Sequence, residues 1–261
     1  MGRQRIDALL ARRGLVPSRA AAAASVRAGQ VQIGQDGPLA LKPSQLVEAD
    51  ADLILRGPPR FVSRGGLKLA NALDRLGIDP GGRLCIDVGA STGGFTDCLL
   101  KAGAARVVAL DVAYGQLDAR LREDPRVTVI ERRNARDLRP GDLPFAPALA
   151  VIDVSFISLT KVLPAVASVL APGGEVLAMV KPQFEVGKGR VGKGGVVRSE
   201  EERRAAVLGV ARAAESLGLP VLGFAPSGLP GPKGNVETFV WLGGEGPGLE
   251  DPAGALAEVD A

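Results

Sequence analysis

The sequence contains no histidine and only two cysteines, Cys85 and Cys98, in 261 residues. Without histidine, every mechanism that needs a Ser-His pair, a Cys-His pair or a histidine metal ligand is excluded. Any general base must therefore be a lysine, a carboxylate, a tyrosine or a cysteine. The two cysteines fit neither a disulfide framework nor a metal-ligand spacing, so we expect no metal and a reducing environment.

Aromatic residues and long apolar runs are also scarce. Aromatics make up 3% of the chain although 46% of it is hydrophobic, so the core is built from Ala, Val and Leu. No stretch reaches 18 apolar residues, and the start MGRQRIDALLARRG lacks the apolar run of a signal peptide. We therefore expect a cytoplasmic protein with no membrane partner.

The formal net charge of +3 is unevenly distributed. Residues 1–30 carry six arginines against one aspartate, whereas residues 243–261 carry five acidic residues and no basic one. A basic end indicates a polyanionic partner, although a solvated helix face has the same composition. The acidic end, 243–261, is rich in Gly and Pro and is expected to be a disordered tail.

The pattern of the chain changes at a Pro- and Gly-containing linker, residues 57–65. Before it, residues 1–56 predict helices over 5–13 and 18–28 followed by short strands and a tight turn, a small α+β domain. Beyond it, residues 66–242 alternate strands with helices. That alternation predicts an α/β fold with a Rossmann-like, doubly wound, mostly parallel sheet.

The expected elements of this larger domain can be given by range. Strands are predicted near 83–88, 106–111, 127–130, 148–152, 174–180, 219–225 and 236–242. Helices are predicted at 66–77, 94–102, 115–122, 157–170 and 199–217.

A glycine-rich turn, DVGASTGG, follows the first of these strands. Ligands of a doubly wound sheet bind at the carboxyl ends of its strands, beside this turn. The turn lacks the Gly-Lys-Ser/Thr of a phosphate loop and the middle glycine of a dinucleotide fingerprint. An adenosyl ligand fits it, because Asp87 can accept the ammonium of S-adenosylmethionine and Asp111 the ribose hydroxyls. Asp111 alone fits NAD equally well, and a tight turn with incidental carboxylates is the alternative without a ligand. The candidate cofactor residues are Asp87, Gly89, Ser91, Gly93, Gly94 and Asp111.

Further polar residues end apolar runs: Asp153 follows ALAVI, Lys181 follows EVLAMV, and Glu237 lies in GNVETFVWL. Lys68 lies on the helix before the first strand. Taken singly, each is most simply interpreted as a surface or capping residue. Together, two lysines and two carboxylates can shift the pKa of one of the lysines. A free lysine has a pKa of about 10.4, which burial and a second ammonium lower and carboxylates raise. A lysine balanced in this way can take a proton from a ribose 2′-hydroxyl.

Four segments resemble the TlyA family of ribosomal RNA 2′-O-methyltransferases, whose catalytic domain is similar to FtsJ: DVGASTGGFTD, VIDVSFISL, VKPQFEVGKGRVGKGGVVR and GPKGNVETF. The resemblance implies S-adenosylmethionine as cofactor and cytidine in the ribosomal RNA of assembled subunits as substrate. It places the family's Lys-Asp-Lys-Glu tetrad on Lys68, Asp153, Lys181 and Glu237, with Lys181 as the base and the others orienting it. FtsJ-like enzymes often have Ala-Pro-Gly-Gly where this chain has Ser91-Thr92-Gly93-Gly94.

The segment RIDALLARRGLVPSRAAAAASVRAGQVQIG is similar to the RNA-binding domain named after ribosomal protein S-four. The resemblance implies that its basic side chains contact phosphates, which position RNA without specifying its sequence. The loop 182–198 either closes over the substrate or stays solvated. The candidate RNA-binding residues are Arg3, Arg5 and Arg19 in this segment, and Arg64, Arg132, Arg136 and Lys188 around the mouth of the larger domain's crevice.

Three other functions compete with RNA methylation. An RNA-binding protein with an inactive methyltransferase fold is disfavoured by the intact tetrad. A haemolysin-type toxin, suggested by names used in the family, is disfavoured because no spanning or amphipathic stretch is present. An NAD enzyme is disfavoured by the missing middle glycine.

Overall fold

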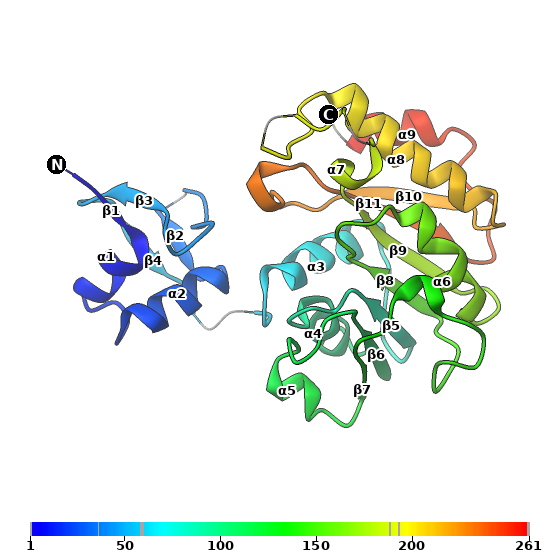
Figure 1. Ribbon diagram of the computed structural model, residues 1–261, viewed down its shortest axis with the longest axis horizontal. Coiled ribbons are helices and arrows are strands. Elements are labelled where there is room, and N and C mark those ends of the chain that lie inside the picture. Colours follow the sequence, from blue (N-terminus) through cyan, green and yellow to red (C-terminus); the bar gives the residue numbers. More distant parts are fainter. Residues whose placement is uncertain (1, 36, 58–59, 188, 193, 260–261) are drawn as a thin grey trace. The chain divides into compact units, whose positions relative to one another are not determined.

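The computed structural model describes residues 2–35, 37–57, 60–187, 189–192 and 194–259 (Figure 1). The chain forms two compact units, Met1–Leu67 and Lys68–Ala261. The division follows shortly after the predicted linker, 57–65, of which residues 58 and 59 lie outside the described part. The end of that linker is helical, because helix α3 already begins at Arg64.

The N-terminal unit is the expected small α+β fold. Its first helix is preceded by a strand that the sequence analysis did not predict, and Ser18 caps the second by accepting from the Ala21 amide at 3.1 Å. The apolar faces of both helices, with Ile6, Leu9 and Val26, are fully buried against the strands. Its elements are β1 (Arg3–Arg5), α1 (Ile6–Arg12), α2 (Arg19–Arg27), β2 (Val31–Ile33), β3 (Leu46–Glu48) and β4 (Leu53–Leu55).

The strands of this unit pair across the chain rather than in a simple hairpin. β1 pairs antiparallel with β3, and β2 with β4. The turn after β2 leaves only an isolated bridge between Gln32 and Leu39. The predicted tight turn is present, since the Ile33 amide donates to the Pro38 carbonyl oxygen at 3.0 Å and the Ala40 amide to that of Val31 at 2.8 Å. Pairing with β4 sets Ile33 opposite Leu53 and Val31 opposite Leu55, and Val31 and Leu53 are both buried in the core of this unit.

The second unit is built on a seven-stranded sheet with the order β10-β11-β9-β8-β5-β6-β7. The neighbours from β9 to β7 are parallel, and β11 runs antiparallel to both β9 and β10. All seven predicted strands are present, and the doubly wound α/β prediction is confirmed. The strands are β5 (Leu84–Val88), β6 (Arg106–Leu110), β7 (Val127–Ile130), β8 (Leu149–Ile152), β9 (Glu175–Val180), β10 (Val221–Pro226) and β11 (Thr238–Gly243).

Helices cover both faces of this sheet (Figure 1). The buried side chains of α6, α8 and α9 form one core cluster with Ile86, Val108 and Ile152 of the strands. The helices are α3 (Arg64–Leu76), α4 (Gly94–Lys101), α5 (Ala119–Arg122), α6 (Leu163–Val169), α7 (Pro182–Glu185), α8 (Glu200–Glu215) and α9 (Pro252–Val259), with 3-10 turns at η1 (Ala135–Asp137), η2 (Leu159–Lys161) and η3 (Pro232–Gly234).

Two predicted helices are shorter than expected. Helix 115–122 is reduced to α5, because Gly115 has a positive φ of 71° and Asp118 caps the helix. Helix 157–170 is divided into η2 and α6, with Pro164 in the first turn of α6 where its missing amide donor costs nothing.

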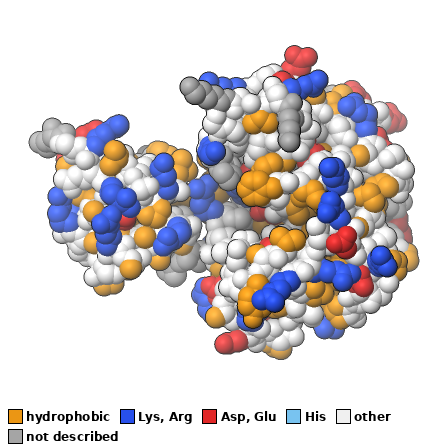
Figure 2. Space-filling model, viewed as in Figure 1, with side chains coloured by type: hydrophobic (Ala, Val, Ile, Leu, Met, Phe, Trp, Pro, Cys, Tyr) orange, Lys and Arg blue, Asp and Glu red, His pale blue; other side chains and the backbone are white. Residues whose placement is uncertain are grey.

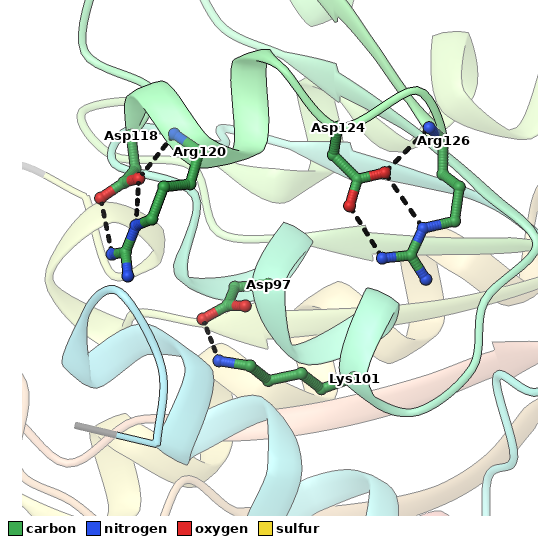
Figure 3. Close-up of polar contacts among 6 residues, drawn as sticks. All are labelled: Asp97, Lys101, Asp118, Arg120, Asp124 and Arg126. Carbon is green, nitrogen blue, oxygen red and sulfur yellow. Dashed lines mark hydrogen bonds and ion pairs between the residues drawn. The ribbon is translucent and has the colours of Figure 1, made fainter. Parts of the chain in front are cut away.

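Local ion pairs fasten the segment between α4 and β7 (Figure 3). The Asp118 and Asp124 carboxylates each bind a guanidinium two residues later, that of Arg120 or Arg126. Both carboxylates also accept the backbone amide of that arginine, and the arginine hydrogen bond lowers the pKa of each. On α4, Lys101 pairs with Asp97 one turn away at 2.9 Å. The cations of these pairs are open to solvent, so the pairs fix turns and helix ends and add little stability.

The acidic end is folded, contrary to the disorder expected from its composition. Gly243 still belongs to β11, and residues 252–259 form α9. Besides its charged residues, this segment has an apolar helix face. Leu256 is 1% exposed and packs in the main core cluster, with Ala255 and Val259 beside it. Burial of that apolar face supplies the free energy that offsets the conformational entropy lost when this segment becomes ordered.

We predict that Leu256→Ala destabilises the second unit by about 2–4 kcal/mol, because it removes a fully buried side chain and leaves a cavity. Urea unfolding followed by circular dichroism measures the change. Leu217→Ala, at a leucine that is 40% exposed, is the matched control and changes stability far less. Equal stability of Leu256→Ala and wild type would show that the end of the chain contributes nothing to the fold.

Candidate active site

The strand pairing gathers the predicted polar residues at one edge of the sheet. Asp87 lies in β5, Asp153 follows β8, and Lys181 follows β9, all near carboxyl ends of parallel strands. Glu237 precedes β11, whose antiparallel direction brings its start to the same edge, with Thr238 opposite Val180. The register therefore brings these four residues to one edge of the sheet.

Lys181 and Asp153 form the first of two ion pairs at this edge. The Lys181 Nζ lies 2.5 Å from Asp153 Oδ1 and donates a hydrogen bond to Ser155 Oγ at 2.9 Å. Lys181 is 8% exposed, whereas the carboxylate side chain of Asp153 keeps a quarter of its surface open. The amine is therefore held in a fixed place behind a partly open carboxylate and a hydroxyl.

Lys68 and Glu237 form the second pair, and it is deeper. The Lys68 Nζ contacts Glu237 Oε2, with Lys68 at 7% and Glu237 at 1% exposure. A Cβ on Gly231 would lie 2.2 Å from Glu237 Oε1, so the segment GPKGNVE needs glycine there for the carboxylate to fit. The pair joins the start of α3 to the start of β11. The structure thus divides the four residues into two pairs, and their catalytic roles stay predictions.

A cavity of about 1000 Å³ opens beside the Lys181–Asp153 pair. Among the described residues, Asp153 is the member of the tetrad that lines it, whereas the other three are buried and do not belong to its lining. A cavity of this size can hold a nucleoside-sized ligand together with a second group. Its lining includes Gly89, Ser91, Asp111, Asp153, Ser155 and Phe156.

The glycine-rich turn forms one wall of this cavity. Gly89 has a φ of +89°, and a Cβ there would lie 2.7 Å from the Asp153 carbonyl oxygen, so only glycine lets the ends of β5 and β8 meet. Gly93, with a φ of +94°, precedes α4, which begins at Gly94. Both oxygens of Asp111 accept backbone amides, those of Ser91 and Ala113, each at 2.7 Å. Each oxygen keeps a lone pair for a further donor, as a ribose requires.

Asp87 is buried at the floor of the turn. Its Oδ2 accepts the amide of Thr96 at 2.8 Å and the Thr96 hydroxyl at 2.7 Å, which fastens the start of α4 to β5. Its Oδ1 is buried and receives no hydrogen bond from any described residue. Burial raises the pKa of Asp87 to about 7, although the Thr96 hydrogen bonds act in the opposite direction. An orphaned carboxylate oxygen at this place suits a cationic group.

A clamp between the segment 153–159 and α7 is a feature that sequence analysis missed. The Glu185 carboxylate accepts the Ser158 hydroxyl at 2.6 Å and the Leu159 amide at 2.8 Å, and burial raises the pKa of Glu185. The rings of Phe156 and Phe184 lie 5.2 Å apart between centroids. Because α7 directly follows Lys181, the clamp fixes the wall that carries the lysine. The sequence offered a signal only in Glu185, a charged residue four positions after Lys181.

Phe156 also presents an unusual surface. Its side chain is 91% exposed and its φ is +64°, a conformation that is rare for a bulky residue. It lines the cavity, so an apolar ring stands open at the mouth. The motif VIDVSFISL predicted a strand followed by a helix and gave no sign of this exposed ring.

The predicted RNA-binding arginines have different environments. In the N-terminal unit, Arg5 and Arg19 both pair with the buried Asp7, at 2.7 and 3.3 Å, while Arg3 pairs with Glu48. The Arg5 hydrogen bonds hold the pKa of Asp7 below its usual value. Their guanidinium groups stay open, at 45% to 67% side-chain exposure. Lys and Arg side chains gather on the visible face of this unit (Figure 2).

The basic residues of the larger unit are divided. Arg136 lines the cavity, whereas Arg132 stacks on the Tyr114 ring at 4.2 Å and does not appear in that lining. Arg64 is the first residue of α3, in the N-terminal unit. Lys188 lies outside the described residues. The RNA-binding role of all of these stays a prediction.

The described residues show neither a metal centre nor a membrane-spanning helix. They contain no group of three or more Cys, Asp or Glu side chains placed to hold a metal ion. In the same part of the chain, no helix has the length and apolar content that crossing a bilayer requires.

Similarity to known proteins agrees with this geometry. Residues 61–244 match the FtsJ-like methyltransferase family. The chain is 51% identical over 242 residues to the 16S/23S rRNA (cytidine-2′-O)-methyltransferase TlyA of Mycobacterium tuberculosis, covering 92% of this chain and 90% of that protein. It is similar to the solved structure of a protein named as a hemolysin from Streptococcus thermophilus, with a TM-score of 0.76 and 39% identity over 100% of this chain and 96% of that one.

The fold is also shared with more distant enzymes. A protein from Listeria monocytogenes, named as an S-adenosylmethionine-dependent methyltransferase, aligns with a TM-score of 0.50 and 14% identity, covering 68% of this chain and 100% of that one. At that identity the likeness concerns the fold alone. From the family match and the extensive identity to TlyA, the chain belongs to the TlyA group of the FtsJ-like methyltransferase family.

Proposed function

We propose that this protein transfers a methyl group from S-adenosylmethionine to the ribose 2′-oxygen of a cytidine in ribosomal RNA. The observation that carries the proposal is the Lys181–Asp153 pair at the rim of a nucleoside-sized cavity. The chain contains no histidine, so a lysine amine is the strongest base held next to the carboxylate that lines this cavity. The relatives named above supply the cytidine and the ribosomal RNA.

The residues of the turn fit the cofactor. The unpartnered Asp87 Oδ1 suits its ammonium, Asp111 suits the two ribose hydroxyls, and Gly89 leaves room for close approach. When bound, S-adenosylmethionine supplies an electrophilic methyl group to the acceptor oxygen. What remains for the protein is to align that oxygen and remove its proton.

Lys181 has the geometry of the base in this proposal. Asp153 and Ser155 hold its Nζ in place, and the deeper Lys68–Glu237 pair supports the edge of β9 through β11. The exposed ring of Phe156 at the mouth can stack on a base that has left its helix, the usual way in which proteins reach a single nucleotide.

The N-terminal unit is the RNA-docking module of the proposal. Its sequence holds ten basic and five acidic residues, so the positive charge of the chain is concentrated there. Arg3, Arg5 and Arg19 present open guanidinium groups even though carboxylates pair with them. In this proposal, phosphate contacts of these arginines position the protein on the RNA of assembled ribosomal subunits in the cytoplasm. Such contacts do not depend on the RNA sequence.

Lys181→Met is expected to lower kcat by about 100- to 10,000-fold, the range for removal of a general base. Transfer of labelled methyl to ribosomal subunits measures it, with cofactor affinity by calorimetry as a check on the site. Lys101→Met, which removes the half-exposed lysine of an ion pair on α4, is the control for loss of a lysine. Substantial methylation by the Lys181 variant would refute its role as base.

The affinity for S-adenosylmethionine is expected to fall as the pH drops through about 7. In the free protein the Asp87 carboxyl is protonated below this pKa, and a neutral carboxyl does not attract an ammonium. The loss approaches about tenfold per pH unit below the pKa and is absent above it. Calorimetric titrations across this range test the idea, and Asp87→Asn should bind weakly with no such pH dependence. A wild-type affinity that is constant from acid to neutral pH would contradict it.

Arg3→Ala and Arg19→Ala are each expected to weaken RNA binding and to lower the slope of log affinity against log salt by about 1 per lost phosphate contact. The measurement is a salt series with a ribosomal RNA fragment. Arg126→Ala, which removes an arginine engaged by Asp124 in the other unit, is the control. An unchanged salt slope in both variants would remove these arginines from the RNA interface.

A further inference from the structure

Ser155 is the residue at the site to which neither the sequence nor the family resemblance gave a role. Its hydroxyl oxygen accepts a hydrogen bond from the Lys181 Nζ at 2.9 Å, and its side chain is exposed and lines the cavity. Within the described part of the chain, Lys181 is the one hydrogen-bonding partner of this hydroxyl. The Ser155 hydroxyl therefore stands between the amine and the space where a substrate lies.

Lys181 itself does not face the cavity, so a substrate meets its neighbours first. The lysine is 8% exposed and does not belong to the described residues that line the cavity, whereas Asp153 and Ser155 do. A substrate hydroxyl that enters the cavity thus reaches the carboxylate or the serine before it reaches the amine. Lys181 engages Asp153 through Oδ1 at 2.5 Å, so the groups open next to the base are the rest of this carboxylate and the Ser155 hydroxyl. Of the two, only the hydroxyl can both accept and donate a hydrogen bond.

We propose that Ser155 is a catalytic residue that relays the 2′-hydroxyl proton to Lys181. The inference rests on the proposed function, in which Lys181 is the base. The step begins once the Lys181 ammonium of the ion pair has released one proton to solvent. The 2′-hydroxyl then donates to Ser155 Oγ while Ser155 donates its own proton to the unprotonated Nζ. As the methyl group arrives, the first proton moves to Ser155 and the second to Lys181, so the serine ends neutral and the lysine ends as an ammonium. The electron pair freed on the 2′-oxygen forms the bond to the methyl carbon, and the pair of the broken methyl–sulfur bond stays on sulfur.

The surrounding structure holds the serine in place for this step. Three residues further along, Ser158 and the Leu159 amide are held by the Glu185 carboxylate, at 2.6 and 2.8 Å. On the other side, Asp153 is fixed by its ion pair with Lys181. The short segment between these two attachments carries Ser155. A relay needs such fixed geometry, because proton transfer requires hydrogen-bond distances at both ends.

The test compares Ser155→Ala, Ser155→Thr and wild type in single-turnover methylation of ribosomal subunits. Ser155→Ala is expected to lower the rate by about 100-fold, the low end for loss of a proton-transfer group, and Ser155→Thr to restore most of it because it keeps the hydroxyl. Ser168→Ala is the matched control: this exposed serine on α6 donates only to the Ala165 carbonyl oxygen. Cofactor and RNA affinities, measured by calorimetry, and thermal unfolding should be the same in all four proteins.

A proton inventory separates a relay from a merely structural role. In mixtures of light and heavy water, two protons in flight give a curved dependence of the wild-type rate, whereas one gives a straight line. Ser155→Ala should give the straight line. A wild-type rate for Ser155→Ala, or a straight line for the wild-type protein, would overturn the relay. If Lys181→Met also stays active, the proposed base itself fails; if Lys181→Met is inactive and Ser155→Ala is not, only the relay fails.

Discussion

Parallel pairing of β5, β8 and β9 is the constraint on which the site depends. It brings Asp87, Asp153 and Lys181, which lie up to 94 residues apart in the chain, to one edge of the sheet. The pairing is tight only because Gly89 lacks a side chain, since a Cβ there would collide with the Asp153 carbonyl oxygen. One missing side chain in the cofactor turn therefore also sets where Asp153 lies, and with it the lysine that the carboxylate holds.

The two ion pairs at this edge differ in burial, and this difference gives one a structural role and leaves the other accessible to a substrate. Lys68 and Glu237 are almost wholly removed from solvent, so breaking one partner would leave a buried charge, which costs a fold several kcal/mol. Lys181 and Asp153 lie at the cavity, where the carboxylate is partly open. The deep pair therefore fastens α3 to β11, and the shallow pair is the one in reach of a substrate. The residue types of the tetrad do not by themselves show which pair is buried and which is open.

Much of the chain could be predicted because its signals are local. Apolar runs with Gly or Pro at their ends marked all seven strands of the sheet, and Ser18 and Ser199 marked two helix starts that the structure confirms. The prediction failed where packing overrides composition. Acidic residues and glycines suggested disorder after residue 243, yet Leu256 turns that segment into a helix docked on the core.

The sequence by itself determined the order of strands and helices, the glycine turn and the residue types available for chemistry, because periodicity, capping and the absence of histidine are written residue by residue. The tertiary structure alone decided which lysine meets which carboxylate, because those contacts depend on strand order and register. It also decided that Ser155 faces the cavity, that Phe156 is exposed, and that Glu185 holds their segment to α7. These contacts arise only when segments distant in the chain meet, and no local pattern records them.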